Sequence, residues 1–269
     1  MQDIDTYVHI LHYGLMATQM DLREFFHLVF LRQLSQRLSG RRWAVKGGIC
    51  LRFFHRSPRM SEDLDLDIEP RIGMDALRNA VESSLEGRPT SSALAAKGIS
   101  GVRATAPKQT RTVQRWKVAL LTGGTNPLGT RIEVSRRRED PPFVAGTPGA
   151  EILERHALTP FMAHFYGPAE MASQKIAALA SPTRTARRDL FDLDHLFTTL
   201  MVKPGDLNAD RIRGDAATAA DKAGGFTYAS FREEVLPFLD ESMMGLYAHG
   251  PAFDALKDRV VAILTRLTG

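Results

Sequence analysis

The feature that most constrains this chain is the acidic segment Asp63-Leu64-Asp65-Leu66-Asp67-Ile68. Its repeat of two places the three aspartates on one face of a β-strand and the apolar residues on the other. Carboxylates about 7 Å apart along a strand repel one another, so a folded protein needs positive charge between them. Mg²⁺ is bound by one or two carboxylates together with substrate phosphates. The segment therefore predicts a strand with a metal-binding face that carries Asp63, Asp65 and Asp67.

A glycine pair, Gly47-Gly48, stands about 15 residues before the acidic segment and directly after the apolar run 43–45 and Lys46. Glycine lets backbone come close to a ligand, and the free N–H groups at the start of a following helix favour phosphate. A phosphate cradle beside a carboxylate metal site indicates metal-assisted transfer involving a nucleotide. The alternative is a surface strand edged with acids next to a glycine turn.

Composition sets few limits beyond these motifs. The chain has 269 residues, 43% hydrophobic and 25% charged, which suits a soluble globular protein of one large or two small domains. We expect no membrane span, because no run approaches 18 apolar residues, and no signal peptide at the acidic N-terminus. Cys50 is the only cysteine, so no intrachain disulfide can form, and a cytoplasmic location is expected.

Periodicity predicts alternating helices and strands in the first part of the chain and helices from about residue 160 onward. The expected helices are 6–39, 49–55, 74–85, 170–179, 186–200, 231–247 and 253–267, and the expected strands are 42–46, 64–68, 101–106, 112–121 and 130–136. Residues 86–99 are rich in Gly, Ser and Ala and are expected to form a loop. The alternation indicates an α/β or α+β sheet domain at 1–150, followed by a helical domain at 151–269.

The order of glycine pair, spacer and Asp-x-Asp resembles the nucleotidyltransferase superfamily. The detailed motif is similar to that of the AbiEii/AbiGii toxin family within this superfamily. It consists of Lys46-Gly47-Gly48 with Leu51-Arg52, followed by Arg59-x-Ser61-x-Asp63-Leu64-Asp65. The resemblance covers about residues 40–200. It implies a nucleotidyltransferase-fold mixed sheet with flanking helices, and Mg²⁺ as cofactor, held by the catalytic residues Asp63 and Asp65. It also implies nucleotide binding by Lys46, Gly47, Gly48, Arg59 and Ser61.

A third acidic group on a neighbouring strand would complete the metal site. In Arg131-Ile132-Glu133-Val134, Arg131 and Glu133 share one face, so Glu133 is the candidate third ligand. The family has a Lys-x-Asp element in this part of the chain, which Arg-x-Glu would replace with both charges kept. The alternative is an exposed ion pair on an edge strand.

Lys175 is the next candidate, on a predicted helix where it shares a face with Met171 and Ala178. A helix lysine near a triphosphate would neutralise charge as pyrophosphate leaves. The family's third motif has a glutamine four residues before this lysine, and here Met171 stands in that place. This sequence therefore keeps the lysine of the family's third motif but not its glutamine. The alternative is a solvent-facing lysine on a helix surface.

The segment Arg187-Arg188-Asp189-Leu190-Phe191-Asp192 resembles the family's last motif. Arg188 and Asp192 are four residues apart and could pair on one helix face. Asp189 is expected to orient Lys175 or to act as general base toward an acceptor hydroxyl. His195 is expected to be structural.

Basic clusters offer contacts for phosphate backbones, although each could equally be a solvated surface. They lie at 103–117, 136–138 and 184–188. Family members act as toxins of two-gene toxin–antitoxin or phage-defence systems. Some add nucleotides to the 3′ acceptor end of tRNA, which blocks charging and so stops translation and growth. The resemblance thus implies an NTP, a tRNA and a cognate antitoxin as partners. The RNA contacts would be Arg136, Arg137, Arg138, Arg184 and Arg187.

Two rival functions remain open. The first is a nucleotidyltransferase with a small-molecule or protein acceptor, for which RNA binding would lack strong salt dependence. The second is a binding protein that keeps the fold without catalysis, against which the electrostatic cost of three clustered aspartates argues. Which NTP and which tRNA are used stays open.

Overall fold

The computed structural model describes residues 4–38, 40, 42–140, 142–184 and 187–269, and for residues 4–18 it describes the backbone alone. The chain forms two compact units. Unit 1 comprises Met1–Arg56 and Met60–Tyr166, and unit 2 comprises Ser57–Arg59 and Gly167–Gly269. The units divide after Tyr166 and not after residue 150, because the last strand of the sheet, Ala163–Tyr166, lies between these points.

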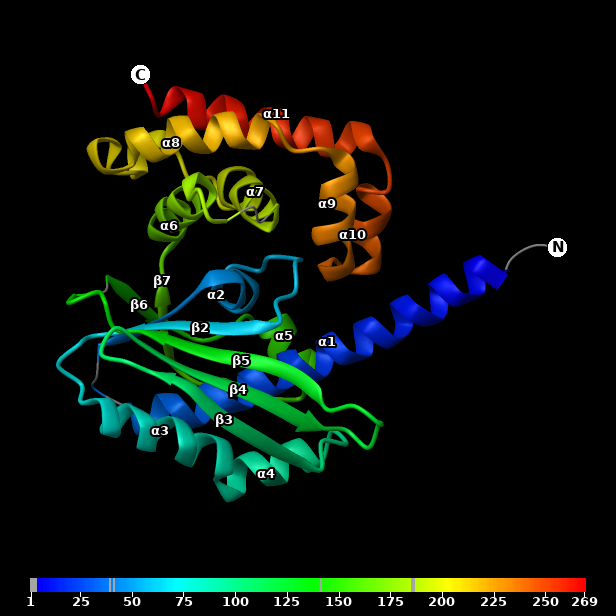
Figure 1. Cartoon of the computed structure of the whole chain (residues 1–269), viewed down its shortest axis with the longest axis vertical. Helices are drawn as coiled ribbons and strands as arrows, with labels where there is room; N and C mark the ends of the chain where they lie inside the picture. Colours follow the sequence, from blue (N-terminus) through cyan, green and yellow to red (C-terminus); the bar gives the residue numbers. More distant parts are fainter. Residues whose placement is uncertain (1–3, 39, 41, 141, 185–186) are drawn as a thin grey trace. The chain divides into compact units, whose positions relative to one another are not determined.

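Unit 1 is built on a seven-stranded mixed sheet in the order β3-β4-β5-β2-β1-β7-β6 (Figure 1). The strands are β1 (Trp43–Lys46), β2 (Asp63–Ile68), β3 (Gly101–Gln109), β4 (Val113–Leu121), β5 (Leu128–Ser135), β6 (Phe143–Gly146) and β7 (Ala163–Tyr166). The pairs β2–β5 and β1–β7 are parallel, and the other neighbours are antiparallel. This confirms the predicted mixed sheet.

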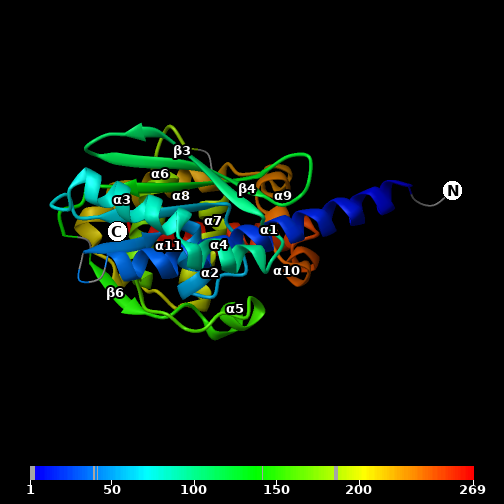
Figure 2. The same ribbon diagram turned by 90° about the horizontal axis from the view of Figure 1, so that it is seen from below.

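Helices cover one face of the sheet. They are α1 (Ile4–Arg37), α3 (Met74–Glu86) and α4 (Arg88–Ala95), which contact one another (Figures 1 and 2). In α1, Phe26, Phe30 and Leu34 repeat every four residues and are fully buried, as a helix facing a core requires. The short α2 (Gly47–Phe54) packs on β1 and β2. Ser39, at the end of the expected first helix, lies outside the described residues.

Three predictions for unit 1 were wrong or incomplete. Residues 86–99 are not a loop, since α4 begins after Gly87 with Pro89 in its first turn, where proline fits, and buries Leu94. Two strands, β6 and β7, were missed because four residues are too few to show a period. The helix α5 (Ala150–Arg155) was missed for the same reason.

Unit 2 is helical as expected. Its helices are α6 (Pro168–Ala180), α7 (Arg188–Asp194), α8 (Ala209–Gly224), α9 (Tyr228–Glu234), α10 (Glu241–Leu246) and α11 (Gly250–Arg266), with a π-helical turn, η1 (His195–Thr199), after α7. Two 3-10 turns, η2 (Pro204–Asp206) and η3 (Leu236–Phe238), complete it. The single helix expected at 231–247 is interrupted at Pro237, since proline cannot donate the helical hydrogen bond. Ala186, the expected start of another helix, is not among the described residues.

None of the helices in the described ranges is long and apolar enough to span a membrane.

Candidate active site

The turn between β1 and α2 brings backbone against the acidic strand. Gly47 has φ +69°, and a Cβ added to it would lie 3.0 Å from Asp65 Oδ2. Both the left-handed backbone and the close approach therefore exclude a larger side chain. The helix begins at Gly47 and not at Ile49 as predicted, so both glycines lie in its first turn. No side chain of Lys46 caps this helix end, which leaves its N–H groups beside Asp65.

Strand register then assembles the charged side chains. In the antiparallel pair β1–β2, Lys46 lies opposite Asp65. In the parallel pair β2–β5, Asp63 is in register with Arg131 and Asp65 with Glu133. The expected alternation is present at this end of β2, where Leu64 is buried and both aspartates are half-buried. The residues expected from β2 and β5 thus lie on adjacent strands.

Two of the three carboxylates have arginine partners. Asp63 Oδ2 lies 2.7 Å from an Arg131 nitrogen, and Glu133 Oε2 lies 2.5 Å from Arg115. Arg131 and Glu133 therefore do not pair with each other, as the alternative of an ion pair on an edge strand required. In addition, β5 is an interior strand of the sheet.

Asp65 differs from these neighbours. Among the described residues its carboxylate has no hydrogen-bond or ion-pair partner. Burial raises the pKa of Asp65, and the carboxylates of Glu133 and Asp63 raise it further, against the opposing charges of Lys46 and Arg131. A half-buried carboxylate without a cation is electrostatically costly, and a bound cation would relieve that cost.

Asp67 is held by two donors that leave it little access to a ligand. Lys46 Nζ donates to Oδ1 at 2.6 Å, and the Tyr166 hydroxyl donates to Oδ2 at 2.7 Å. Asp67 is 6% exposed. Burial and the Asp67 charge raise the pKa of Tyr166, so the phenol stays protonated as a donor. Sequence reasoning missed Tyr166, because the four-residue strand β7 that carries it gives no periodic signal.

Unit 2 holds a second charged cluster, which is buried. Lys175 Nζ lies 2.8 Å from Asp189 Oδ1 and 2.6 Å from Asp192 Oδ2. Arg59 donates to both oxygens of Asp192 at 2.8 Å. Arg184 Nε lies 3.0 Å from Asp189 Oδ2 as an ion pair without hydrogen-bond geometry. Asp189 thus contacts Lys175, as its expected orienting role requires.

This cluster excludes one alternative and one predicted ion pair. Lys175 is buried, 6% exposed, so it is not a solvent-facing helix lysine. Burial opposes its charge, yet Asp189 and Asp192 raise the pKa of Lys175 and keep it an ammonium. The predicted Arg188–Asp192 pair is wrong, because Asp192 binds Arg59 and Lys175 while Arg188 lies 4.5 Å from the Phe238 ring centroid.

Two predicted nucleotide-binding residues have other contacts. The Arg59 guanidinium is buried on Asp192 within unit 2, so it serves that unit's packing in this conformation and is not presented to a nucleotide. The hydroxyl of Ser61 donates to the Asp63 carbonyl at 3.4 Å.

The predicted RNA contacts are unequal. Arg136 is 6% exposed and donates to the carbonyls of Pro70, at 3.0 Å, and Ile72, so it cannot reach a phosphate as predicted. Arg137 is exposed. Arg138 lies 5.3 Å from the Tyr166 ring centroid.

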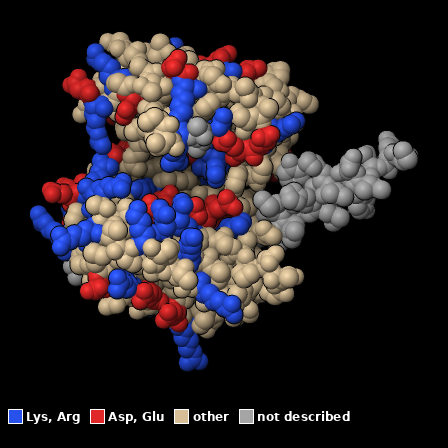
Figure 3. Space-filling model, in the orientation of Figure 1, with Lys and Arg blue, Asp and Glu red and all other residues tan. Residues whose placement is uncertain are grey.

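In unit 2, the side chain of Arg184 is 52% exposed, and Arg187 is paired with Glu234 at 2.8 Å. Basic and acidic side chains are interspersed over the visible face, with blue groups beside red ones in Figure 3.

The donor set fits Mg²⁺ bound together with a substrate. Across the described ranges, no group of three or more His, Cys, Asp or Glu side chains is arranged to hold a metal. Glu133 and Asp63 are each paired with an arginine, so the role of Glu133 as a third ligand stays a prediction. Two carboxylates such as Asp63 and Asp65 plus substrate phosphates are an ordinary Mg²⁺ set, whereas Zn²⁺ would need more protein ligands.

A mixed sheet with a glycine turn close to an Asp-x-Asp strand is the arrangement that the motifs predicted for a nucleotidyltransferase. The profile of the family described as "Nucleotidyl transferase AbiEii toxin, Type IV TA system" matches residues 29–259. The chain belongs to this family, so it is a toxin of a toxin–antitoxin system, as its motifs predicted. A comparison with curated proteins finds no match.

Solved structures share the fold. MenT4, the nucleotidyltransferase toxin Rv2826c from Mycobacterium tuberculosis H37Rv, is 16% identical with a TM-score of 0.59, covering 95% of this chain and 89% of that chain. JHP933 from Helicobacter pylori is 18% identical with a TM-score of 0.51, covering 88% and 91%. Identities this low show the fold alone.

Proposed function

We propose that this toxin transfers a nucleoside monophosphate from an NTP to the 3′ end of tRNA, which prevents charging and stops growth, as in phage defence. The observation that carries the transfer chemistry is Asp65. It is a half-buried carboxylate without a cation partner, and the uncapped start of α2 lies against it.

In this mechanism the first turn of α2 receives the phosphates. The N–H groups of Gly47 and Gly48 donate to phosphate oxygens, and the partly exposed ammonium of Lys46 adds charge. Asp63 and Asp65 would hold Mg²⁺, which polarises the phosphate and offsets its negative charge. The acceptor hydroxyl attacks the α-phosphorus in line, and pyrophosphate leaves.

Lys175 and Asp189 remain proposed catalytic residues. Their contacts support a fixed, charged lysine, because Asp189 and Asp192 hold its ammonium from two sides. Such an ammonium would offset charge on the leaving pyrophosphate, with Asp189 as a positioning group for Lys175. The alternative role of Asp189 is that of a general base. The pH–rate profile of transfer distinguishes this role from the positioning of Lys175.

Family membership supports RNA as the acceptor, and the exposed side chains of Arg137 and Arg184 offer phosphate contacts. The rival acceptors are a small molecule or a protein. A binding protein without catalysis would have no need for an uncapped first turn of α2 beside Asp65.

The decisive experiment incubates the full chain with total tRNA and each α-labelled NTP in turn, followed by a denaturing gel. We expect label on tRNA with one or a few NTPs, none with Asp65→Asn, and none when periodate has oxidised the tRNA 3′ end. Label on protein or on small molecules alone would favour the rival acceptors. No transfer to any acceptor would favour the binding protein.

A further inference from the structure

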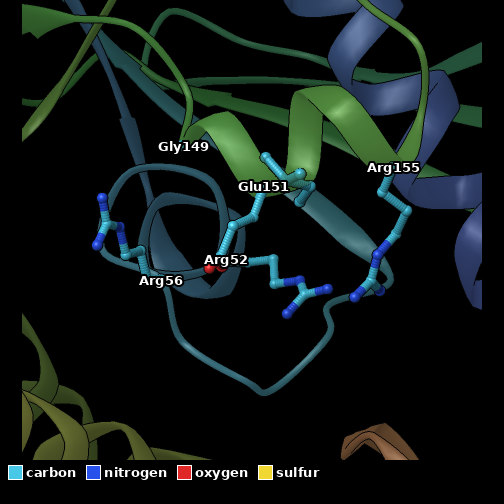
Figure 4. Close-up of a pocket in the computed structure, with 6 residues that line it drawn as sticks. Arg52, Arg56, Gly149, Glu151 and Arg155 are labelled. Atoms are coloured by element: carbon cyan, nitrogen blue, oxygen red, sulfur yellow. The ribbon is translucent and has the colours of Figure 1, made fainter.

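Unit 1 has an arginine-lined pocket at the end of α2 opposite the glycine pair. Its walls are Arg52 and Arg56 from α2 and the residue after its cap, and Gly149, Glu151, Ile152 and Arg155 from α5 and the residue before it (Figure 4). Its volume is about 60 Å³, which is enough for a phosphate group. Figure 4 shows the side chains of Arg52 and Arg155 turned toward the same side of the pocket.

The three arginines of this pocket differ in their partners. Arg52 is neutralised by Glu24, whose oxygen lies 2.7 Å from Arg52 Nε and which also bonds His156 at 3.0 Å. Neither Arg56 nor Arg155 has an ion-pair or hydrogen-bond partner for its guanidinium in the part of the chain that the structure describes. Arg155 does interact electrostatically with the carboxylate of Asp21, which leaves Arg56 as the pocket guanidinium without a carboxylate partner among the described residues.

The backbone at the pocket is strained. Arg56 has φ 55°, a left-handed conformation that is uncommon for any residue other than glycine, asparagine or aspartate. Such strain persists where the surrounding structure imposes it, and it clusters at ligand clamps. Here the Gly149 N–H donates to the Phe53 carbonyl at 2.7 Å, which fixes α5 on the end of α2. The fold therefore holds an arginine in a costly conformation at the rim of an anion-sized pocket.

We propose that this pocket binds one phosphate of the RNA acceptor's backbone. The inference rests on the proposed RNA substrate and adds a contact that the basic clusters of the sequence did not include. Helix α2 links this pocket to the glycine turn that is proposed to bind the nucleotide. At 1.5 Å per residue, Arg52 lies about 8 Å along α2 from Gly47. A strand whose 3′ end meets the nucleotide at the start of α2 would thus be held a short distance upstream. RNA is favoured over a free NTP, whose phosphates are bound by the other end of the helix.

The test measures binding of the full chain to a fluorescent hairpin that mimics a tRNA acceptor stem, across 50–200 mM salt. The variants are Arg56→Gly, Arg155→Ala and their combination. The matched control is Arg88→Ala, an exposed arginine on α4 outside the pocket. Binding of each α-labelled NTP and transfer to tRNA are followed in parallel.

The slope of log affinity against log salt is negative. We expect each pocket variant to make it less steep by about 0.7–0.9, and the combination by about twice that. Each lost contact corresponds to about fivefold to eightfold weaker RNA binding at 0.1 M salt. NTP binding and the Arg88→Ala control should match wild type. Arg56→Gly should keep or raise the melting temperature, because glycine relieves the left-handed strain, so its loss of RNA binding cannot be due to unfolding.

Unchanged RNA affinity and salt slope in the double variant overturn the inference, and basic side chains at the end of α2 would then serve only its helix dipole. An equal loss of NTP binding also overturns it. If wild type labels tRNA while the pocket variants bind it normally, the pocket assignment alone has failed. A wild-type chain that neither binds nor labels RNA overturns both this inference and the proposed acceptor.

Discussion

At the scale of single residues, the site in unit 1 is defined by which carboxylates have partners. The sequence predicted that Asp63, Asp65 and Asp67 share a strand, and period two was enough for that. It could not show that Asp67 would be bound by Lys46 and Tyr166 while Asp65 would be left without a cation. Those contacts depend on strand neighbours, and the partner Tyr166 comes from about 100 residues further along the chain.

The raised pKa of Asp65 gives a pH prediction. A carboxyl with a folded pKa above its ordinary 3.8 contributes stability below that value, which is lost as pH rises through the folded pKa. We therefore expect the stability of Asp65→Asn relative to wild type to rise as pH increases above about 4. Urea unfolding of both proteins in the presence of a chelator, at pH steps of one unit, measures this. A difference independent of pH would contradict it.

Removing the hydroxyl of Tyr166 should cost stability. Tyr166→Phe deletes a 2.7 Å hydrogen bond to a buried carboxylate, and bonds to charged groups contribute about 1.5–3 kcal/mol. The control is Tyr228→Phe, which loses bonds to neutral carbonyls of residues 247 and 248 and should cost about 0.5–1.5 kcal/mol. Urea denaturation gives both values, and an equal or smaller loss in Tyr166→Phe would show that the Asp67 bond contributes nothing special.

At the scale of elements, α6 and α7 present the buried cluster of unit 2. Helical spacing predicted the two helices, and the motif resemblance brought Lys175 and Asp189 together. The partner Arg59 could not be foreseen, since it precedes Asp192 by 133 residues and belongs to a three-residue segment with no periodic signal. The break at Pro237 was visible in the sequence and should have divided the predicted helix 231–247.

The cluster makes Lys175 a structural residue as well as a proposed catalytic one. Lys175→Met leaves Asp189 and Asp192 buried without their shared ammonium, and breaking a buried pair costs about 3–5 kcal/mol. Adding Asp189→Asn should recover part of this loss, because one buried charge is removed. Urea unfolding tests it, and wild-type stability in Lys175→Met would contradict it.

Activity then has to be measured per folded molecule. We expect Lys175→Arg to fold better than Lys175→Met yet to transfer poorly, because a planar guanidinium does not replace a compact ammonium. Loss of one charge-stabilising group lowers transfer by about 10²- to 10³-fold. A folded Lys175→Met protein with the wild-type rate would remove Lys175 from the catalytic residues.

At the scale of the whole molecule, the chain is a toxin by family, so its activity should stop growth. We expect induced expression in a bacterium without the cognate antitoxin to arrest growth, while Asp63→Ala does not. The carboxylate of Asp63 is partly exposed and its pair with Arg131 lies at the surface of the site, so little stability should be lost. Immunoblots confirm equal protein levels, and Arg88→Ala serves as a toxic control. Harmless expression of wild type would favour a small-molecule acceptor.

The path of the chain through the two units has an evolutionary consequence. Three residues, Ser57–Arg59, belong to unit 2 although unit 1 continues on both sides of them, and Arg59 is bonded there to Asp192. A gene cut at any single codon therefore cannot yield both units intact. Recombination that exchanged the C-terminal half between paralogues would separate Arg59 from its carboxylate. We expect the two halves of this gene to have been inherited together, with positions 59 and 192 changing in concert.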